Sequence, residues 1–270
     1  MESRSTNLFR TTLIRLAFTL ALVISPGITT ATELPHEFSA VYTLEMYSTV
    51  LARATYTLKH TDNGLYMEQS TRPVGLAALL RDDKIDVRSD MVIDNGQLLL
   101  VSYDYKHTGD DEDRDVSFKI QWQADSKQGI NGKAVGIYEG SEVDLDVKQA
   151  VWDPLSIQVP LMLHAGKNLP PHEHGMFLKG EFKYYLFENL GKEDVSFDGN
   201  QYTAVKMAGK ETRRDRAMYA WLVPELHYLP VKIEQWKNGK LKSTVKLESA
   251  TFENSIDSLS ENATNNSSGL

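Results

Sequence analysis

Short alternating segments separated by Asn–Gly-type turns limit the fold of this chain more than any other feature. Asn95-Gly96 and Asn238-Gly239 each stand between two apolar runs, and so do Asp62-Asn63-Gly64 and Asp198-Gly199-Asn200. Asn and Gly tolerate positive φ angles, which tight hairpin turns require. The flanking segments alternate apolar and polar residues, as residues 84–94 do. Repeated hairpins of this kind predict an antiparallel sheet.

Two segments interrupt the strand pattern and predict short helices. Residues 73–83, PVGLAALLRDD, place Leu76, Leu79 and Leu80 at helical spacing. Residues 152–171 begin with Asp153 as a candidate N-cap, and Pro160 and Gly166 inside this segment predict a kink and an end. A doubly wound parallel sheet would need helices regularly alternating with strands, and this chain lacks them. We therefore expect helices on one side of an antiparallel sheet.

The N-terminal residues have the order of a secretory signal peptide. Three arginines precede the apolar run LAFTLALVI (residues 16–24), and breaker residues and small residues follow it. We predict a signal peptide over residues 1–31 with cleavage after Ala31, and an uncleaved anchor is the alternative. The run is shorter than the roughly 20 residues that span a bilayer, so we expect no transmembrane segment in the mature chain. Residues 32–253 are predicted to be one β-rich domain and the polar residues 254–270 a disordered tail.

Composition excludes several kinds of site. The chain has no cysteine, which rules out disulfides, thiolate metal sites and a cysteine nucleophile. Loss of residues 1–31 removes three arginines and one glutamate, so the formal net charge falls from −8 to −10. A domain this acidic is a poor partner for nucleic acid, whose phosphates require a basic patch. We predict that the protein binds no nucleic acid.

Few residues suggest catalysis or metal binding. His172 and His174 would lie on one face of a strand, and His164 is near them in sequence. Paired imidazoles suit Zn or Cu, but a full site needs three or four ligands, and an exposed loop after two prolines is the alternative. The chain has no G-x-S-x-G elbow and no glycine-rich phosphate loop. We therefore predict no catalytic residue, no metal and no cofactor.

Residues 217–223 form a strand pattern that is apolar on both faces. Tyr219, Trp221 and Val223 would point one way, and the residues between them, which are also apolar, would point the other way. Such a strand lies either in the centre of a core or between the core and a cavity. The core interpretation is the ordinary one, because large apolar residues usually pack inside proteins.

Several segments together resemble a secreted family of Gram-negative periplasmic proteins that is known only as a domain of unknown function. They are RPVGLAALLRDD, GQLLLVSYDYKH, VSFKIQW, DPLS and AWLVPELHYLPVKIEQWKNGKL, and the resemblance covers most of residues 36–253. It implies a β-rich periplasmic protein and supplies no catalytic residues. The LPVKI strand also resembles half-barrel lipoprotein carriers and sensors of the periplasm. Together these predict a mainly β (α+β) fold, a curved antiparallel sheet or half-barrel with two short helices packed on its concave side.

These observations support three hypotheses about function. The first is a periplasmic, non-enzymatic protein that binds a hydrophobic small molecule or lipid between the sheet and the helices. The second is a cell-envelope scaffold that binds a protein partner and has a filled core, and the third is a hydrolase of envelope glycans or lipids. The first predicts that Leu79→Asp abolishes ligand retention. Its predicted lining residues are Leu76, Leu79, Leu80, Leu155, Leu161, Leu163 and Trp221.

Overall fold

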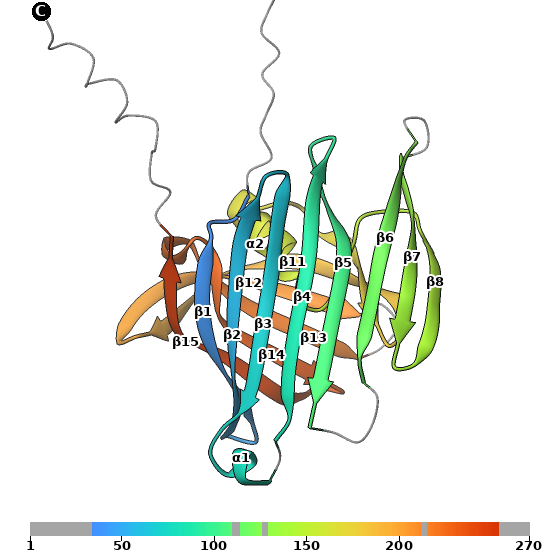
Figure 1. Ribbon diagram of the computed structural model, residues 1–270. Coiled ribbons are helices and arrows are strands. Elements are labelled where there is room, and N and C mark those ends of the chain that lie inside the picture. The colour runs from blue at the N-terminus through green and yellow to red at the C-terminus, as the bar shows by residue number, and fades with distance from the viewer. Residues whose placement is uncertain (1–33, 81, 110–113, 126–128, 212–214, 254–270) are drawn as a thin grey trace, which may run out of the picture. The chain divides into compact units, whose positions relative to one another are not determined.

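All strands belong to one continuous sheet in the computed structural model, which describes residues 34–253 apart from 81, 110–113, 126–128 and 212–214 (Figure 1). The order of the fifteen strands is β8-β7-β6-β5-β4-β3-β2-β1-β15-β14-β13-β12-β11-β10-β9. Their bounds are Phe38–Met46 (β1), Thr49–Thr61 (β2), Gly64–Pro73 (β3), Lys84–Asp94 (β4), Gln97–Thr108 (β5), Val116–Asp125 (β6), Gly129–Tyr138 (β7), Ser141–Val147 (β8), Val151–Trp152 (β9), His172–Leu178 (β10), Glu181–Phe197 (β11), Asn200–Glu211 (β12), Arg216–Val223 (β13), Leu229–Lys237 (β14) and Lys240–Phe252 (β15).

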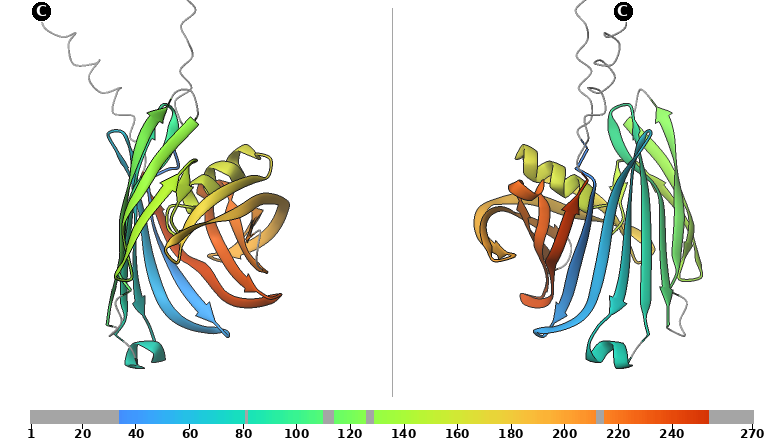
Figure 2. Two further views of the ribbon diagram at one scale, coloured as in Figure 1. Left: turned by 90° about the vertical axis from the view of Figure 1, so that its right-hand side faces the viewer. Right: turned by 60° about the vertical axis from the view of Figure 1, so that its left-hand side comes forward.

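The strand order divides the sheet into an N-half, β1–β8, and a C-half, β9–β15. The two halves join where β1 pairs with β15, with Phe38 opposite Phe252. Among the described strands, only the short β9 runs parallel to its neighbour; the other pairs are antiparallel. Figure 2 shows the sheet curving so that the two halves face each other. The predicted mainly β class with a curved antiparallel sheet is therefore confirmed.

Three of the four predicted Asx–Gly turns have the expected backbone. Asn95-Gly96, Asp198-Gly199 and Asn238-Gly239 each place two residues at positive φ between paired strands, as tight hairpins require. Gly64 has a different role, because its φ is not positive. A Cβ atom there would lie 2.1 Å from the backbone oxygen of Met91, so glycine allows β3 and β4 to approach closely.

Strand signals in the sequence are weak over residues 124–150, where the structure contains the β7–β8 hairpin. Its turn is Glu139-Gly140, again with two positive φ angles but without the Asn that would have marked it. Gly136 in β7 weakens the strand signal, yet it lets the backbone pack against Phe118, since a Cβ atom would lie 2.6 Å from the Phe118 Cβ. Polar residues alternate with Val143 and Val147 in β8, so only one face is apolar.

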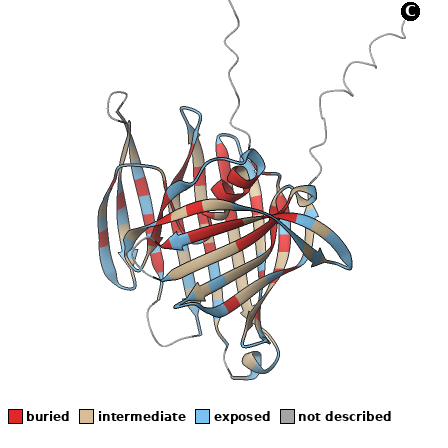
Figure 3. Cartoon of the chain, turned by 180° about the vertical axis from the view of Figure 1, so that it is seen from behind, coloured by how far each residue is buried: buried red, intermediate tan, exposed pale blue. Residues whose placement is uncertain are grey.

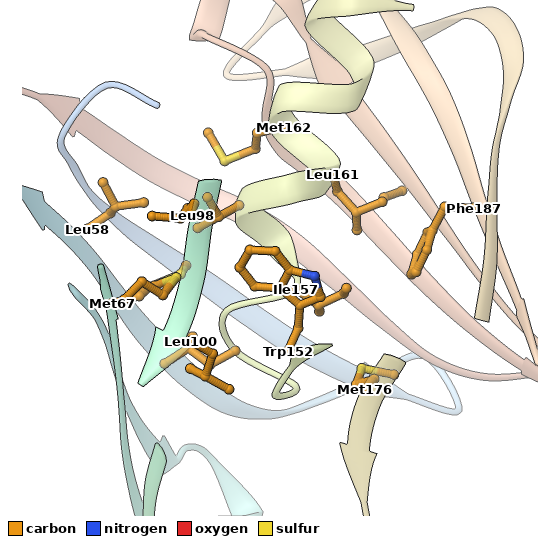
Figure 4. Close-up of a cluster of buried hydrophobic side chains, with 14 of the residues drawn as sticks. Leu58, Met67, Leu98, Leu100, Trp152, Ile157, Leu161, Met162, Met176 and Phe187 are labelled. Carbon is orange, nitrogen blue, oxygen red and sulfur yellow. The ribbon is translucent and has the colours of Figure 1, made fainter. Parts of the chain in front are cut away.

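Side chains from both halves meet in one core, seen as the buried residues in Figure 3 and in close-up in Figure 4. Alternation along each strand sends one set of side chains inward. The N-half contributes Leu58, Leu65, Met67, Met91, Leu100 and Phe118, and the C-half contributes Met176, Phe187, Met207 and Leu222. The core is thus a layer of side chains between the two halves of one sheet.

The two predicted helices have different environments. Helix α2, Gln158–Lys167, buries Val159, Leu161 and Met162 in the core cluster. Helix α1, Leu76–Leu80, is shorter than predicted and connects β3 to β4 at one end of the N-half (Figure 1). No described α1 side chain belongs to the core cluster. The structure therefore does not confirm that both helices pack on the concave side of the sheet.

The start of α2 differs from the predicted start in a way that its proline explains. Asp153 caps a turn over residues 153–157, and the helix begins after that turn, at Gln158. Pro160 lies in the first turn of the helix, where a missing backbone N–H leaves no intrahelical bond unmade. It therefore does not interrupt the helix. Asn168, in the left-handed region with φ 48°, ends it in place of the predicted Gly166.

Residues 1–31 and 254–270 lie outside the described residues, so the signal peptide and the disordered tail stay predictions. The single-domain boundaries, 32–253, also stay a prediction. Among the residues that are described, no helix combines the length and the apolar character needed to cross a membrane.

Candidate functional site

A groove of about 320 Å³ lies beside α2. Its walls come from three irregular or helical segments: the residues before β1, the helix α2, and the connection between β13 and β14, which contains the 3₁₀ helix Pro224–Leu226. We call it the α2 groove. It is lined by Leu34, Pro35, His36, Met162, Leu163, Gly166, Lys167, Pro224, His227 and Tyr228.

Met162 connects the floor of the α2 groove with the core. Its side chain is 4% exposed and belongs to the same core cluster as Leu58 and Leu98 (Figure 4). Methionine is unbranched and flexible, so it adapts to space of varying shape. A molecule entering the α2 groove would therefore meet an apolar side chain that is continuous with the protein interior.

Local backbone features form one wall of the α2 groove. Gly166 faces the ring of Tyr228, and a Cβ atom at this position would lie 3.1 Å from the ring. His227 and Tyr228 both have positive φ, which turns the chain sharply after the 3₁₀ helix, and the His227 N–H donates to the Pro224 carbonyl at 3.0 Å. The aromatic side chain of Tyr228 is thereby placed against α2.

Two histidines form the polar rim of the groove. The rings of His36 and His227 stack with centroids 3.8 Å apart, and Phe252 contacts the His227 ring edge-on. Burial lowers the pKa of His227, and the neighbouring His36 lowers it further, because two imidazolium groups would repel each other. The His227 ring is therefore mostly neutral near pH 7 and can donate or accept hydrogen bonds.

A second histidine cluster lies between α2 and β10. The rings of His164, His172 and His174 have pairwise centroid distances of 5.7, 5.2 and 4.9 Å. Burial lowers the pKa of His174 to about 3, with smaller contributions from His164 and His172. The structure thus brings together all three histidines that the sequence singled out as candidate metal ligands.

The tautomer of His174 argues against metal binding there. The Trp152 Nε1–H donates to His174 Nδ1 at 3.2 Å, so Nδ1 is the acceptor and Nε2 carries the proton. A protonated Nε2 cannot ligate a metal. Within the described chain, no group of three or more histidine, aspartate or glutamate side chains is arranged to hold a metal ion. The absence of a metal stays a prediction.

A larger, polar groove of about 620 Å³ lies over strands β2–β7. Its walls carry charged and hydroxyl side chains: Arg88 donates to Glu68, Ser70 to Asp86 and Ser117 to Asp104. The sequence did not indicate this groove, because the residues that line it are the ordinary outward-facing residues that alternate with core residues along each strand. Several of these polar groups therefore satisfy one another.

The predicted lining residues do not gather around one cavity. Leu163 lines the α2 groove, whereas Leu155 and Leu161 are packed in the core at 1% and 2% exposure. Leu76 and Leu79 are 75% and 81% exposed on α1 and line neither groove. The side chain of Leu80 is not among the described ones.

Trp221 is buried at 2% exposure, but on the face of the sheet that carries lysines. Its strand partners across the sheet are Lys206 and Lys232, and partners in register lie on one face. The ammonium groups lie 4.7 and 3.5 Å from the centroid of the indole ring, within cation–π range. The strand is apolar on both faces because the lysine stems cover one of them.

Residues that the sequence did not single out contribute most of the α2 groove. Leu34 precedes the first strand, and Tyr228 follows a left-handed turn, so neither belongs to a periodic pattern. The only signal for Met162 was its place beside Leu163 in the second helical segment. Because the α2 groove is formed by three segments that are far apart in the chain, its residues have no regular spacing in the sequence.

The single curved sheet of fifteen strands makes this a β-barrel-like protein. A crystal structure of a β-barrel-like protein of the domain of unknown function DUF1849 from Brucella abortus has a similar fold, with a TM-score of 0.54 and 12% identity, over 82% of this chain and 100% of that one. Two further structures are less similar. They are a candidate exported protein with YmcC-like fold from Bacteroides fragilis (TM-score 0.35, 10% identity, 82% and 99% covered) and a candidate lipoprotein from Parabacteroides distasonis (0.33, 11%, 82% and 97%).

The chain belongs to DUF3108, a family of proteins of unknown function, whose sequence profile matches residues 41–246. The resemblance to a family known only as a domain of unknown function is therefore confirmed. No curated protein matches the chain.

Proposed function

We propose that this protein binds a hydrophobic or lipid-like ligand in the cell envelope, and that the ligand enters through the α2 groove. The observation that carries the proposal is Met162, which lines the groove and belongs to the core at the same time. In this proposal α2 is the helix on the concave side of the sheet. No catalytic residue is assigned.

The composition of the groove fits an amphipathic ligand. Leu34, Met162 and Leu163 offer apolar surface for a hydrocarbon chain, and the stacked histidines at the rim offer hydrogen bonds to a polar head. Ligand sites in proteins commonly combine mostly apolar walls with a few polar groups, and their volumes begin near roughly 300 Å³. A periplasmic location, predicted from the N-terminal residues, would give the protein access to envelope lipids.

The test is to purify the protein from the envelope's soluble fraction and to measure its mass under native conditions, followed by organic extraction. We expect a reproducible excess mass that extraction releases as a molecule with a hydrocarbon chain. The same measurement gives the mass of the chain, which shows whether residues 1–31 have been removed.

Two variants locate the ligand. Leu163→Trp would fill the groove with a larger side chain, and we expect it to lose the bound ligand while its thermal unfolding stays cooperative. Leu79→Asp changes the exposed helix α1, and it tests the sequence-based prediction that α1 covers the ligand. Retention by Leu79→Asp and loss by Leu163→Trp assign the site to the α2 groove, whereas the reverse pattern assigns it to α1.

The packing of Leu155 and Leu161 favours a second candidate function, a scaffold with a filled core. These residues were expected to line a cavity, and their own neighbours cover them. A mass without any bound molecule, even after incubation with envelope phospholipids, would support the scaffold and contradict the ligand proposal.

A further inference from the structure

Exposed apolar side chains gather at one end of the N-half. We call this the apolar end and define it by Tyr47, Val50, Leu76 and Leu79, which are 87%, 39%, 75% and 81% exposed. The first two lie at the β1–β2 turn and the other two on α1, and Figure 1 shows both elements at the same end of the sheet.

Backbone contacts hold the two elements of the apolar end together. Ala52 in β2 is opposite Pro73 in β3, and the Val74 N–H donates to the Leu51 carbonyl at 3.0 Å. Helix α1 follows directly after this bond. The leucines on α1 therefore stand beside the β1–β2 turn in a fixed arrangement.

Lysines flank the apolar end on the neighbouring hairpin. Glu45 near the end of β1 is opposite Thr244 in β15, which places the β14–β15 turn beside the β1–β2 turn. This turn exposes Lys237, Lys240 and Lys242. Among the described residues, none of the three forms an ion pair.

Two carboxylates near the apolar end pair with lysines outside the β14–β15 turn, whereas Asp215 lies beside the turn, opposite in charge to its three lysines, and its carbonyl accepts from the Asn238 N–H at 2.9 Å. Asp82, just after α1, pairs with Lys84 at 4.0 Å, and Glu45, near the end of β1, pairs with Lys246 at 2.8 Å. The surface thus presents protruding apolar groups next to positive charge. Neither of the two grooves described above includes any residue of the apolar end.

We propose that the apolar end docks on the surface of an anionic phospholipid bilayer. Tyr47, Leu76 and Leu79 would enter the region between head groups and acyl chains, where tyrosine and leucine are favoured. The lysines of the β14–β15 turn would lie near lipid phosphates. A bilayer fits better than a protein partner, because its fluid surface accepts side chains that protrude separately and form no groove.

The first test is flotation of the full exported protein with vesicles of phosphatidylcholine alone and with about 30% phosphatidylglycerol added, on the scale where anionic lipid gives a strong surface potential. We expect binding to the anionic vesicles that weakens as salt is raised. Equal binding to both kinds of vesicle, or none to either, would overturn the proposal.

Variants assign the binding to the apolar end. We expect Leu76→Ser/Leu79→Ser to lower vesicle affinity at least about tenfold, because both side chains are exposed and serve no packing in the folded protein. A triple change of Lys237, Lys240 and Lys242 to Gln should remove most of the salt dependence. The matched control is Val135→Ser/Leu190→Ser, two side chains that are each 46% exposed elsewhere on the sheet. An equal loss in this control would contradict the assignment.

The lack of cysteine allows a direct measurement of insertion. Leu79→Cys would carry the only thiol, and an environment-sensitive fluorophore attached there should shift to the blue when anionic vesicles are added. The same label on the Val135→Cys variant should not shift. A blue shift only in the Val135→Cys variant would place the contact elsewhere and refute the proposal. So would the absence of a shift in both variants while the protein still floats with the vesicles.

Discussion

Asp153 has no exposure to solvent and holds a tight network of hydrogen bonds. Its Oδ1 accepts from the N–H groups of Leu155 and Ser156 at 2.7 and 2.9 Å, and its Oδ2 accepts from the Ser156 hydroxyl at 2.7 Å. Burial raises the pKa of Asp153, while the bonds from Ser156 oppose that rise. This carboxylate fixes the turn that leads into α2, and therefore the position of the α2 groove.

Asp153→Ala is expected to lower the free energy of unfolding by about 3 kcal/mol, because it removes a cap and leaves buried N–H groups unpaired. Denaturant unfolding followed by circular dichroism measures the change. Asp144→Ala is the control, since Asp144 is exposed and pairs with Lys133, and exposed pairs contribute about 0–1 kcal/mol. A loss similar to that of the control would show that the network does not stabilise the turn.

His174 makes stability depend on pH. Its folded pKa, about 3, is below the ordinary value of 6.5, so the unfolded chain binds a proton more readily. The neutral ring's contribution is complete above pH 6.5 and is lost as the pH falls from 6.5 toward 3. Between about pH 7 and 5 we expect a loss of about 2 kcal/mol that the His174→Gln variant lacks. The control His60→Gln changes an exposed ring and should keep this pH-dependent loss. If His174→Gln loses as much stability as the parent protein between pH 7 and 5, the prediction is wrong.

At the scale of elements, the sequence predicted which helices and hairpins exist better than it predicted what surrounds them. The hairpins at Asn95-Gly96 and Asn238-Gly239 could be predicted because their turn chemistry is local. The two helical segments could also be found, but their leucine stripes look alike. The two helices differ in whether the fold packs them into the core. This depends on residues far away in sequence, such as Leu98, which belongs to the same core cluster as the buried residues of α2.

The same substitution on the two helices should therefore have different effects. Leu161→Ala removes a core side chain with 2% exposure, and we expect a destabilisation of about 3 kcal/mol. Leu79→Ala, at 81% exposure, should stay within about 0.5 kcal/mol of the parent protein. Chemical denaturation of both variants measures the contrast. Equal effects would mean that α1 packs against the protein in solution.

At the scale of the whole molecule, the ends of the described chain lie side by side. The Glu253 N–H donates to the Glu37 carbonyl at 3.2 Å, and β8 and β9, which follow each other in the chain, are the two edges of the sheet. The sequence could not show this closure, because pairing between the first and last strands leaves no local pattern. The α2 groove was missed for the same reason, since Leu34 and Tyr228 come from distant segments.

A circular permutant tests this arrangement. Joining residue 253 to residue 34 by a short linker and opening the chain between β8 and β9, at residues 148–150, should leave all strand pairs intact. We expect cooperative unfolding and a far-ultraviolet spectrum like that of the parent. A chain that stops at Gly239 lacks β15, which pairs with both β1 and β14, and should not fold. If the truncated chain folds, the β1–β15 pairing is not required for folding.

The pairing of β1 with β15 also affects when the protein can fold. Phe38 and Phe252 are far apart in sequence, so the β1–β15 pairing at the centre of the sheet forms only after residue 252 has been synthesised. Long-range strand pairing of this kind is slow, because a large loop must close before its contacts form. The hairpins within each half are local, so we expect the two halves to form before the β1–β15 pairing joins them. The strand order therefore makes the joining of the two halves the last step in assembling the sheet.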